Sequence, residues 1–140
     1  MDLEALETSF DLIAPRGDEL VEIFYADLFT TAPAVIPMFA GTDMKRQRAM
    51  LLSALVLLRK SLRNLDAIVG TLHTMGARHV GYGAQPEHYP VVGEVLIGAM
   101  SKVAGEAWEP RFAQAWETAF GVVAGAMIAG AADAELAAAA

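Results

Sequence analysis

The stretch ARHVGYGAQPEHYP, residues 77–90, governs the interpretation of the whole chain, because it holds two of the three histidines. The residues before it are apolar and helix-like, and a new helix is expected to begin at Pro90. His79 therefore falls at the end of a predicted helix, and His88 falls in the turn that follows. A lone histidine in such a place usually caps a helix, forms a hydrogen bond in a turn or is solvated, so a functional role needs further support.

The composition limits the classes of protein to which the chain can belong. Its 140 residues suit one domain with a single core, and the 55% of hydrophobic residues exclude a disordered chain. The net charge of -7 argues against nucleic acid as a partner. The absence of cysteine excludes disulfides, thiolate metal sites and thioether-linked haem. We expect a cytoplasmic protein without a signal peptide or membrane span, because the N-terminus is acidic and the apolar runs are short.

Helix starts and stops recur along the chain, and no stretch alternates as a strand would. The expected helices run from Asp2 to about Ala14, from Asp18, from Pro33 to near Phe39, from Thr42 or Asp43 to about Arg63, from Asp66 to near His79, and from Pro90 and Pro110 onward. This gives six or seven helices and no sheet. The last helix is expected to fade beyond Asp133, which leaves a domain of residues 1–133 and an Ala-rich tail of residues 134–140.

Polar residues within the apolar stripes are the informative ones. Gln47 lies one turn before Leu51, at the start of a leucine stripe. A buried amide without a partner costs roughly 1–3 kcal/mol, so Gln47 either reaches water from the first turns of its helix or has a partner inside. Tyr25 lies in an apolar face where phenylalanine would fit, and the alternative there is an ordinary core tyrosine bonded to a backbone carbonyl.

His79 ends an apolar stripe that includes Leu72 and Met75. His73 lies about 240° away round a helix of 3.6 residues per turn, so these two histidines cannot share a ligand. A zinc site would need more ligands on one face, and the chain has no Walker loop, GxSxG or HExxH motif. One imidazole among leucine, methionine and phenylalanine suits a large, flat, apolar cofactor that carries a single iron.

With these residues in place, the sequence resembles the bacterial globins of the flavohaemoglobin and Vitreoscilla haemoglobin branch, without a reductase domain. The matching segments are FYADLFTTAPAVIPMF (24–39), the pair Gln47 and Leu51, ARHVGYGAQPEHYPVVGEVL (77–96) and AWETAFGVVA (115–124). They occur in the family's order and cover nearly the whole chain. The resemblance implies an all-α globin fold, with six to eight helices packed around a pocket for haem b.

The resemblance also implies residue roles. His79 matches the proximal ligand of the haem iron, and Phe39 matches the phenylalanine stacked on the haem. Tyr25 and Gln47 match the distal tyrosine and glutamine that stabilise a bound ligand. The residues implied to contact the haem are Phe39, Gln47, Leu51, Met75, Arg78, His79, Tyr89 and Val92. His88 would then lie in the turn before the next helix.

Two positions depart from the flavohaemoglobin pattern. The glutamate that joins the proximal hydrogen-bond network in that family matches Ala131, and the tyrosine earlier in the last helix matches Phe120. Without the carboxylate, less electron density is expected to reach the iron through the imidazole, which disfavours O–O chemistry. Residues 1–140 include no reductase sequence, so we expect any redox cycle to need a separate flavin or NAD(P)H reductase.

The resemblance therefore implies a protein that reversibly binds O2, NO and CO at haem iron, for oxygen binding, delivery or transport. The alternative is nitric oxide dioxygenation, which converts NO and O2 to nitrate and makes the protein an enzyme when an external electron donor is present. A third class, a helical interaction module, is disfavoured by His79 and Phe39.

Overall fold

The computed structural model describes residues 1–139, and these residues form six α-helices joined by short segments of 3-10 helix, without a strand. The α-helices are α1 (Leu3–Ile13), α2 (Gly17–Thr31), α3 (Met44–Ser61), α4 (Val69–Gly81), α5 (His88–Ala104) and α6 (Pro110–Ala139). The 3-10 segments are η1 (Ala14–Arg16), η2 (Pro33–Phe39), η3 (Leu65–Ile68) and η4 (Gly105–Ala107). The predicted all-α class is confirmed.

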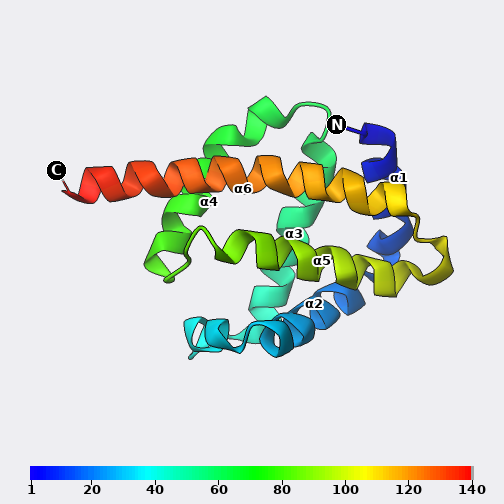
Figure 1. The fold of residues 1–140 in the computed structure, drawn as a ribbon, viewed down its shortest axis with the longest axis horizontal. Helices are drawn as coiled ribbons and strands as arrows, with labels where there is room; N and C mark the ends of the chain where they lie inside the picture. The colour runs from blue at the N-terminus through cyan, green and yellow to red at the C-terminus, as the bar shows by residue number, and fades with distance from the viewer. Residues whose placement is uncertain (140) are drawn as a thin grey trace.

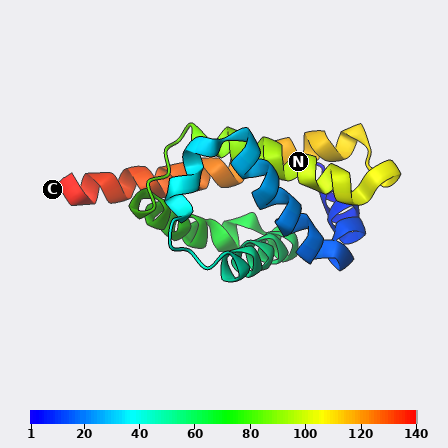
Figure 2. The ribbon, with the colours of Figure 1, turned by 90° about the horizontal axis from the view of Figure 1, so that it is seen from below.

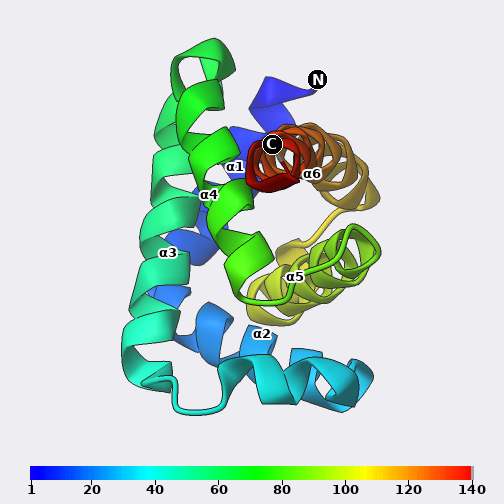
Figure 3. The ribbon, with the colours of Figure 1, turned by 90° about the vertical axis from the view of Figure 1, so that its left-hand side faces the viewer.

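The helices cross one another in two groups (Figure 1). α5 and α6 run side by side across the front, and α3 and α4 cross behind them. Seen from one end, α4 lies directly against α6, while α3 and α4 together form one side of the molecule (Figure 3). α2 lies at the bottom in Figure 1 and therefore nearest the viewer in Figure 2, and it packs against both α5 and α3. The inward faces of α2, α3, α4 and α5 therefore face a common interior region.

Local chemistry explains where four of these helices begin, namely α1, α3, α6 and the 3-10 segment η2. The Asp2 carboxylate accepts a hydrogen bond from the backbone N–H of Ala5, and the Asp43 carboxylate accepts bonds from the backbone N–H groups of Lys45 and Arg46. Pro33 and Pro110 are the first residues of η2 and α6, as expected for a residue whose φ suits a helix start. These four predicted starts are confirmed, and Asp43 rather than Thr42 is the cap of α3.

Three predicted boundaries differ from the structure. α4 continues through Gly81, two residues beyond the predicted end. α5 begins at His88, two residues before the predicted start, because Pro90 is tolerated in the first turn of a helix. α6 continues without interruption to Ala139, so the predicted fading beyond Asp133 is wrong for the described part of the tail. Alanine has the highest helix propensity, which explains why the Ala-rich segment extends the helix. Residue 140 lies outside the described residues.

The core draws on all six α-helices, and one of its polar contacts joins α1 to α6. Ser9 and Trp116 are fully buried. The indole Nε1–H of Trp116 donates to Ser9 Oγ over 2.8 Å, and the Ser9 hydroxyl donates to the carbonyl oxygen of Ala5 over 2.6 Å. Both buried polar groups are thus paired, which joins α6 to α1 and avoids the cost of an unsatisfied donor.

One helix among the described residues, α6, is long and apolar enough to cross a membrane, judged by length and composition over Pro110–Glu135. The sequence analysis counted only uninterrupted apolar runs and therefore did not single it out. This is weak evidence for a span, because the core helices of globular proteins pass the same test. In the structure, α6 packs against α4, α1 and α5.

Candidate functional site

His79 is held in one tautomer by its own helix. Its Nδ1 lies 2.6 Å from the carbonyl oxygen of Met75, one helical turn earlier in α4. A carbonyl oxygen only accepts, so Nδ1 donates and carries the proton. In the neutral ring the other nitrogen, Nε2, then keeps its lone pair, and no group among the described residues forms a hydrogen bond with it. The side chain is half-buried. An oriented, neutral imidazole of this kind is suited to ligate a metal.

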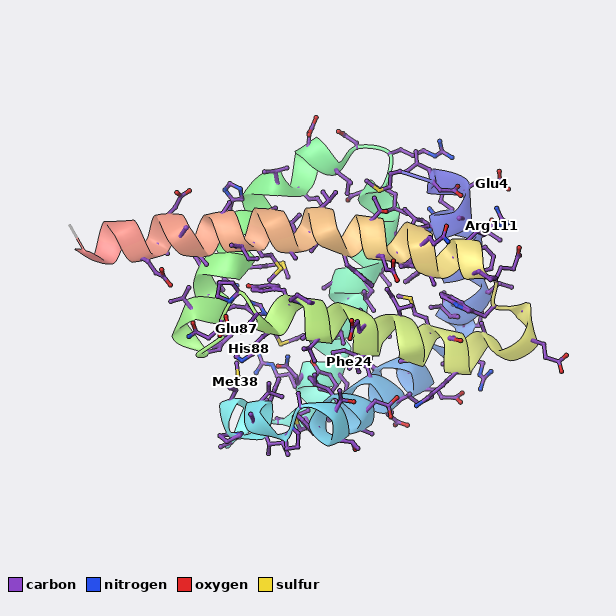
Figure 4. The ribbon with its side chains drawn as sticks, viewed as in Figure 1. Glu4, Phe24, Met38, Glu87, His88 and Arg111 are labelled. Atoms are coloured by element: carbon purple, nitrogen blue, oxygen red, sulfur yellow. The ribbon has the colours of Figure 1, made fainter. Side chains whose placement is uncertain are left out.

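His88 has the opposite arrangement. Its Nδ1 accepts a hydrogen bond from the backbone N–H of Gln85 over 3.0 Å, so the proton of a neutral ring lies on Nε2. His88 was predicted in the turn before the helix, whereas in the structure it is the first residue of α5 and its ring accepts a hydrogen bond from that turn. In Figure 4, its side chain extends from α5 towards η2, where Met38 extends back towards α5. The two histidines of the 77–90 segment therefore have different roles.

Tyr25 and Gln47 form a pair inside the molecule. The Gln47 amide Nε2 donates to the Tyr25 hydroxyl oxygen over 3.1 Å, and Tyr25 is only 5% exposed. The partner of Gln47 is therefore internal. Tyr25 does not donate to a backbone carbonyl of the described residues, so its hydroxyl proton is available to another acceptor. α2 and α3 thus present one hydroxyl donor, held in place by an amide.

Burial raises the pKa of Tyr25 above its ordinary value of 10.0. The hydrogen bond from Gln47 and the positive charge of Arg48 act in the opposite direction but do not cancel this effect. The side chain is therefore a protonated donor at neutral pH. Arg48 was not given a role by the sequence analysis, because only the three-dimensional structure brings its charge near the hydroxyl.

Aromatic contacts hold Phe39 beside this pair. Its ring meets Tyr25 edge-on, with centroids 5.8 Å apart, and meets Phe29 in the same way at 5.3 Å. Phe39 is itself half-buried. Phe29 lies four residues after Tyr25 on the same helix, a spacing that predicts a contact, and the two ring centroids are 6.1 Å apart.

The remaining predicted site residues fall into two groups. Four are half-buried apolar side chains at the edge of the core, from three different helices: Leu51, Met75, Tyr89 and Val92. Arg78 is exposed in the last turn of α4 and forms no ion pair within the described part of the chain. The structure thus gathers an incompletely covered apolar lining from α3, α4 and α5.

A small cavity of about 70 Å³ lies between α4, the start of α5 and α6. Its lining consists of Gly76, Val80, Ala84, Pro86, Tyr89, Ile128, Ala131, Ala132 and Glu135. Ala131 thus lies beside Tyr89, with no carboxylate of its own. Glu135, one turn further along α6, also borders this cavity but is exposed. Burial raises the pKa of Tyr89 above 10.0.

A fold of crossed helices that carries an oriented imidazole on α4 and a buried Tyr–Gln pair between α2 and α3 is typical of the globin class. The globin family model matches residues 22–127, and the chain belongs to the globin family. It is 32% identical to the flavohemoprotein of Bacillus subtilis strain 168 over 90% of this chain and 32% of that protein. It is 31% identical to the flavohemoprotein of Deinococcus radiodurans over 81% of this chain and 28% of that protein. The chain spans about a third of the length of these curated relatives.

Two solved structures share the fold over nearly their full length. A globin of Campylobacter jejuni is 26% identical with a TM-score of 0.81, and covers 94% of each chain. An engineered carbene transferase from Rhodothermus marinus is 25% identical with a TM-score of 0.88, and covers 99% of this chain and 96% of that one. The predicted globin fold and the resemblance to the flavohaemoglobin branch are both confirmed.

Tyr25 should ionise only above pH 10.0, because burial raises its pKa. The unfolded chain ionises first, so the stability contributed by the neutral phenol is complete below pH 10.0 and is lost as pH rises through the folded pKa. Gln47→Leu removes a hydrogen bond that lowers this pKa, and should raise it further. Tyrosinate absorbance during an alkaline titration measures the pKa of Tyr25 and its change in the Gln47→Leu variant. Tyr25→Phe identifies the Tyr25 signal, and Tyr82→Phe, at a 57% exposed position, is the control. A Tyr25 that titrates together with free tyrosine would contradict this assignment.

Proposed function

We propose that the protein is a b-type haem globin that binds diatomic ligands reversibly, chiefly for oxygen binding or delivery. The observation that carries the proposal is the hydrogen bond from His79 Nδ1 to the Met75 carbonyl, which leaves Nε2 free to ligate iron. Membership of the globin family implies a haem cofactor. When bound, haem supplies an iron that takes one protein nitrogen and one small ligand.

The residues present fit a haem. The half-buried side chains of Phe39, Leu51, Met75 and Val92 supply the apolar surface that a planar macrocycle needs. Arg78 is exposed at the end of the helix that carries His79, and its guanidinium can pair with a haem carboxylate at the protein surface. Cysteine is absent, which fits a cofactor held by ligation and packing alone.

On the distal side, the chain's contribution is a single oriented proton donor. The Tyr25 hydroxyl accepts from Gln47, and its own proton can be donated to a ligand that carries partial negative charge, as O2 does on ferrous haem. Such a charge-assisted bond contributes roughly 1.5–3 kcal/mol, or about a 10- to 150-fold change in ligand retention. The Gln47 amide keeps the hydroxyl from turning away.

Nitric oxide dioxygenation is the second candidate. It is favoured by the similarity to flavohemoproteins and to the Rhodothermus marinus protein, for whose parent this activity has been suggested. Ala131 places no carboxylate beside Tyr89, which argues for weak electron donation through His79. We therefore rank reversible ligand binding above dedicated catalysis, with a separate flavin or NAD(P)H reductase as the partner that catalysis would need.

His79→Ala should abolish stable haem binding, or leave haem that added imidazole restores, because Nε2 is the proposed iron ligand. The Soret band and the rate of haem loss measure this. His73→Ala is the matched control, since His73 lies on the same helix but on another face. An unchanged Soret band and haem affinity in the His79 variant would end the assignment.

Tyr25→Phe should speed O2 dissociation by about tenfold or more, because it removes a charge-assisted donor and little volume. Dissociation of CO should change much less, since CO accepts hydrogen bonds weakly. Stopped-flow measurements of both ligands test this. If the two rates change by the same factor, the effect is steric and Tyr25 is not the donor.

Mixing the oxygenated protein with excess NO distinguishes the two candidate functions. We expect about one nitrate per haem without a reductant, because nothing in residues 1–139 resembles a flavin or nicotinamide site. Adding a flavin reductase should permit slow cycling. Rapid multiple turnover with the reductase would favour the dioxygenase, whereas no turnover beyond the first nitrate, even with the reductase, would favour an oxygen carrier.

A further inference from the structure

α4 rests directly on the backbone of α6 at two glycines. A Cβ placed on Gly76 would overlap the backbone carbonyl of Met127, and a Cβ placed on Gly130 would overlap the backbone of His73. Both fall well inside 3.0 Å, an approach that real Cβ atoms essentially never make. The contacts are reciprocal, because positions 73 and 76 of α4 face positions 130 and 127 of α6. The two helices thus touch backbone to backbone.

Other glycines of the same helices show that this closeness is specific. Gly70 of α4 and Gly125 of α6 have open space where a Cβ would lie, with no atom within 4 Å. Glycine in a helix interior costs about 0.8–1 kcal/mol relative to alanine. At Gly76 and Gly130 the absence of a side chain allows a close contact between the helices that any other residue would prevent. The contact forms part of the packing between α4 and α6 that Figure 3 shows end-on.

This contact acts on the peptide unit that orients His79. The Met75 carbonyl and the Gly76 N–H belong to one planar peptide group, so a support at Gly76 fixes the direction of the Met75 oxygen. That oxygen accepts the hydrogen bond from His79 Nδ1 at 2.6 Å. The chain of contacts therefore runs from the α6 backbone at Met127, through Gly76 and the Met75 carbonyl, to the imidazole.

We propose that Gly76 and Gly130 are positioning residues for His79, and that α6 sets the direction of its Nε2 through backbone contact alone. This inference rests on the proposed function, in which His79 ligates haem iron. It explains how the imidazole is oriented although Ala131, the residue after Gly130, offers no polar side chain. Separation of α4 from α6 would rotate the Met75 carbonyl and weaken the bond between His79 and iron.

The test compares Gly76→Ala and Gly130→Ala with the matched controls Gly70→Ala and Gly125→Ala, all in haem-loaded protein. The readouts are the iron–histidine stretching band of the ferrous form, measured by resonance Raman spectroscopy, and the rate of haem transfer to apomyoglobin. We expect Gly76→Ala and Gly130→Ala to lower the band frequency and to speed haem loss about 10- to 100-fold, the usual effect of disturbing a ligand's hydrogen-bond partner. The controls should change neither.

A further background separates positioning from general stability. In His79→Gly protein reconstituted with free imidazole, the ligand is no longer attached to α4, so Gly76→Ala should leave the iron–imidazole band unchanged. Variants that unfold more easily but keep the unaltered stretching band would overturn the proposal. A band shift that persists with free imidazole would overturn it too.

Gly130 lies nine residues before the described end of α6, where the helix can tilt, so its variant should fold even if Gly76→Ala does not. If neither variant folds, hydrogen exchange of the unaltered protein tests the proposal instead. The amides around Gly76 and those around Gly130 should then become exposed to solvent in one opening event. Independent opening of the two segments would refute the proposal. If His79→Ala releases haem but the glycine variants keep the band, only this inference fails. If His79→Ala retains haem normally, the proposed function fails first.

Discussion

The hydrogen bond between His79 Nδ1 and the Met75 carbonyl is the interaction on which the proposed haem chemistry depends. It decides which ring nitrogen carries the proton, and so which one can ligate a metal. A helix provides such an acceptor without any additional side chain, because the carbonyl one turn earlier lies below the ring. The position of that carbonyl is in turn supported by the backbone contact of α4 with α6. The proximal side is therefore organised by main-chain groups.

The distal side follows a different principle. There, two side chains from different helices satisfy each other in a largely apolar surrounding, since Gln47 donates to Tyr25. Burial keeps Tyr25 protonated, and Phe39 and Phe24 pack edge-on against its ring. This arrangement presents one rigid donor, which suits selective retention of a polarised ligand. In the proposed haem site, His79 as iron ligand together with this single donor would be more consistent with ligand binding than with strong activation of an O–O bond.

Features that depend on nearby residues could be predicted from the sequence. The caps at Asp2 and Asp43, the start of α6 at Pro110 and the inward position of Gln47 all follow from short-range spacing. The start of α5 and the helical course of residues 134–139 were missed, because proline is tolerated in a first turn and alanine extends a helix.

The contacts that orient the site could not be predicted in this way. Gly76 and Met127 are far apart in the chain, and nothing in their local sequence distinguishes Gly76 from Gly70, which has open space around it. The tautomer of His79 depends on a side-chain rotamer, and the influence of Arg48 on Tyr25 depends on how α3 lies against α2. Ala131 showed that a carboxylate was absent, but only the structure placed Glu135 at the border of the same cavity.

The central claim is that His79 binds iron through Nε2 while Nδ1–H is held by Met75. Nitrogen-15 NMR of the histidine rings in haem-loaded protein, in the diamagnetic ferrous form with CO, tests it most directly. The expected spectrum has a His79 Nδ1–H protected from exchange by its hydrogen bond and an Nε2 shifted by the metal. His88 serves as the internal reference, with its proton on Nε2 and an unprotonated Nδ1. A His79 ring with its proton on Nε2, or with neither nitrogen affected by iron, would contradict the claim.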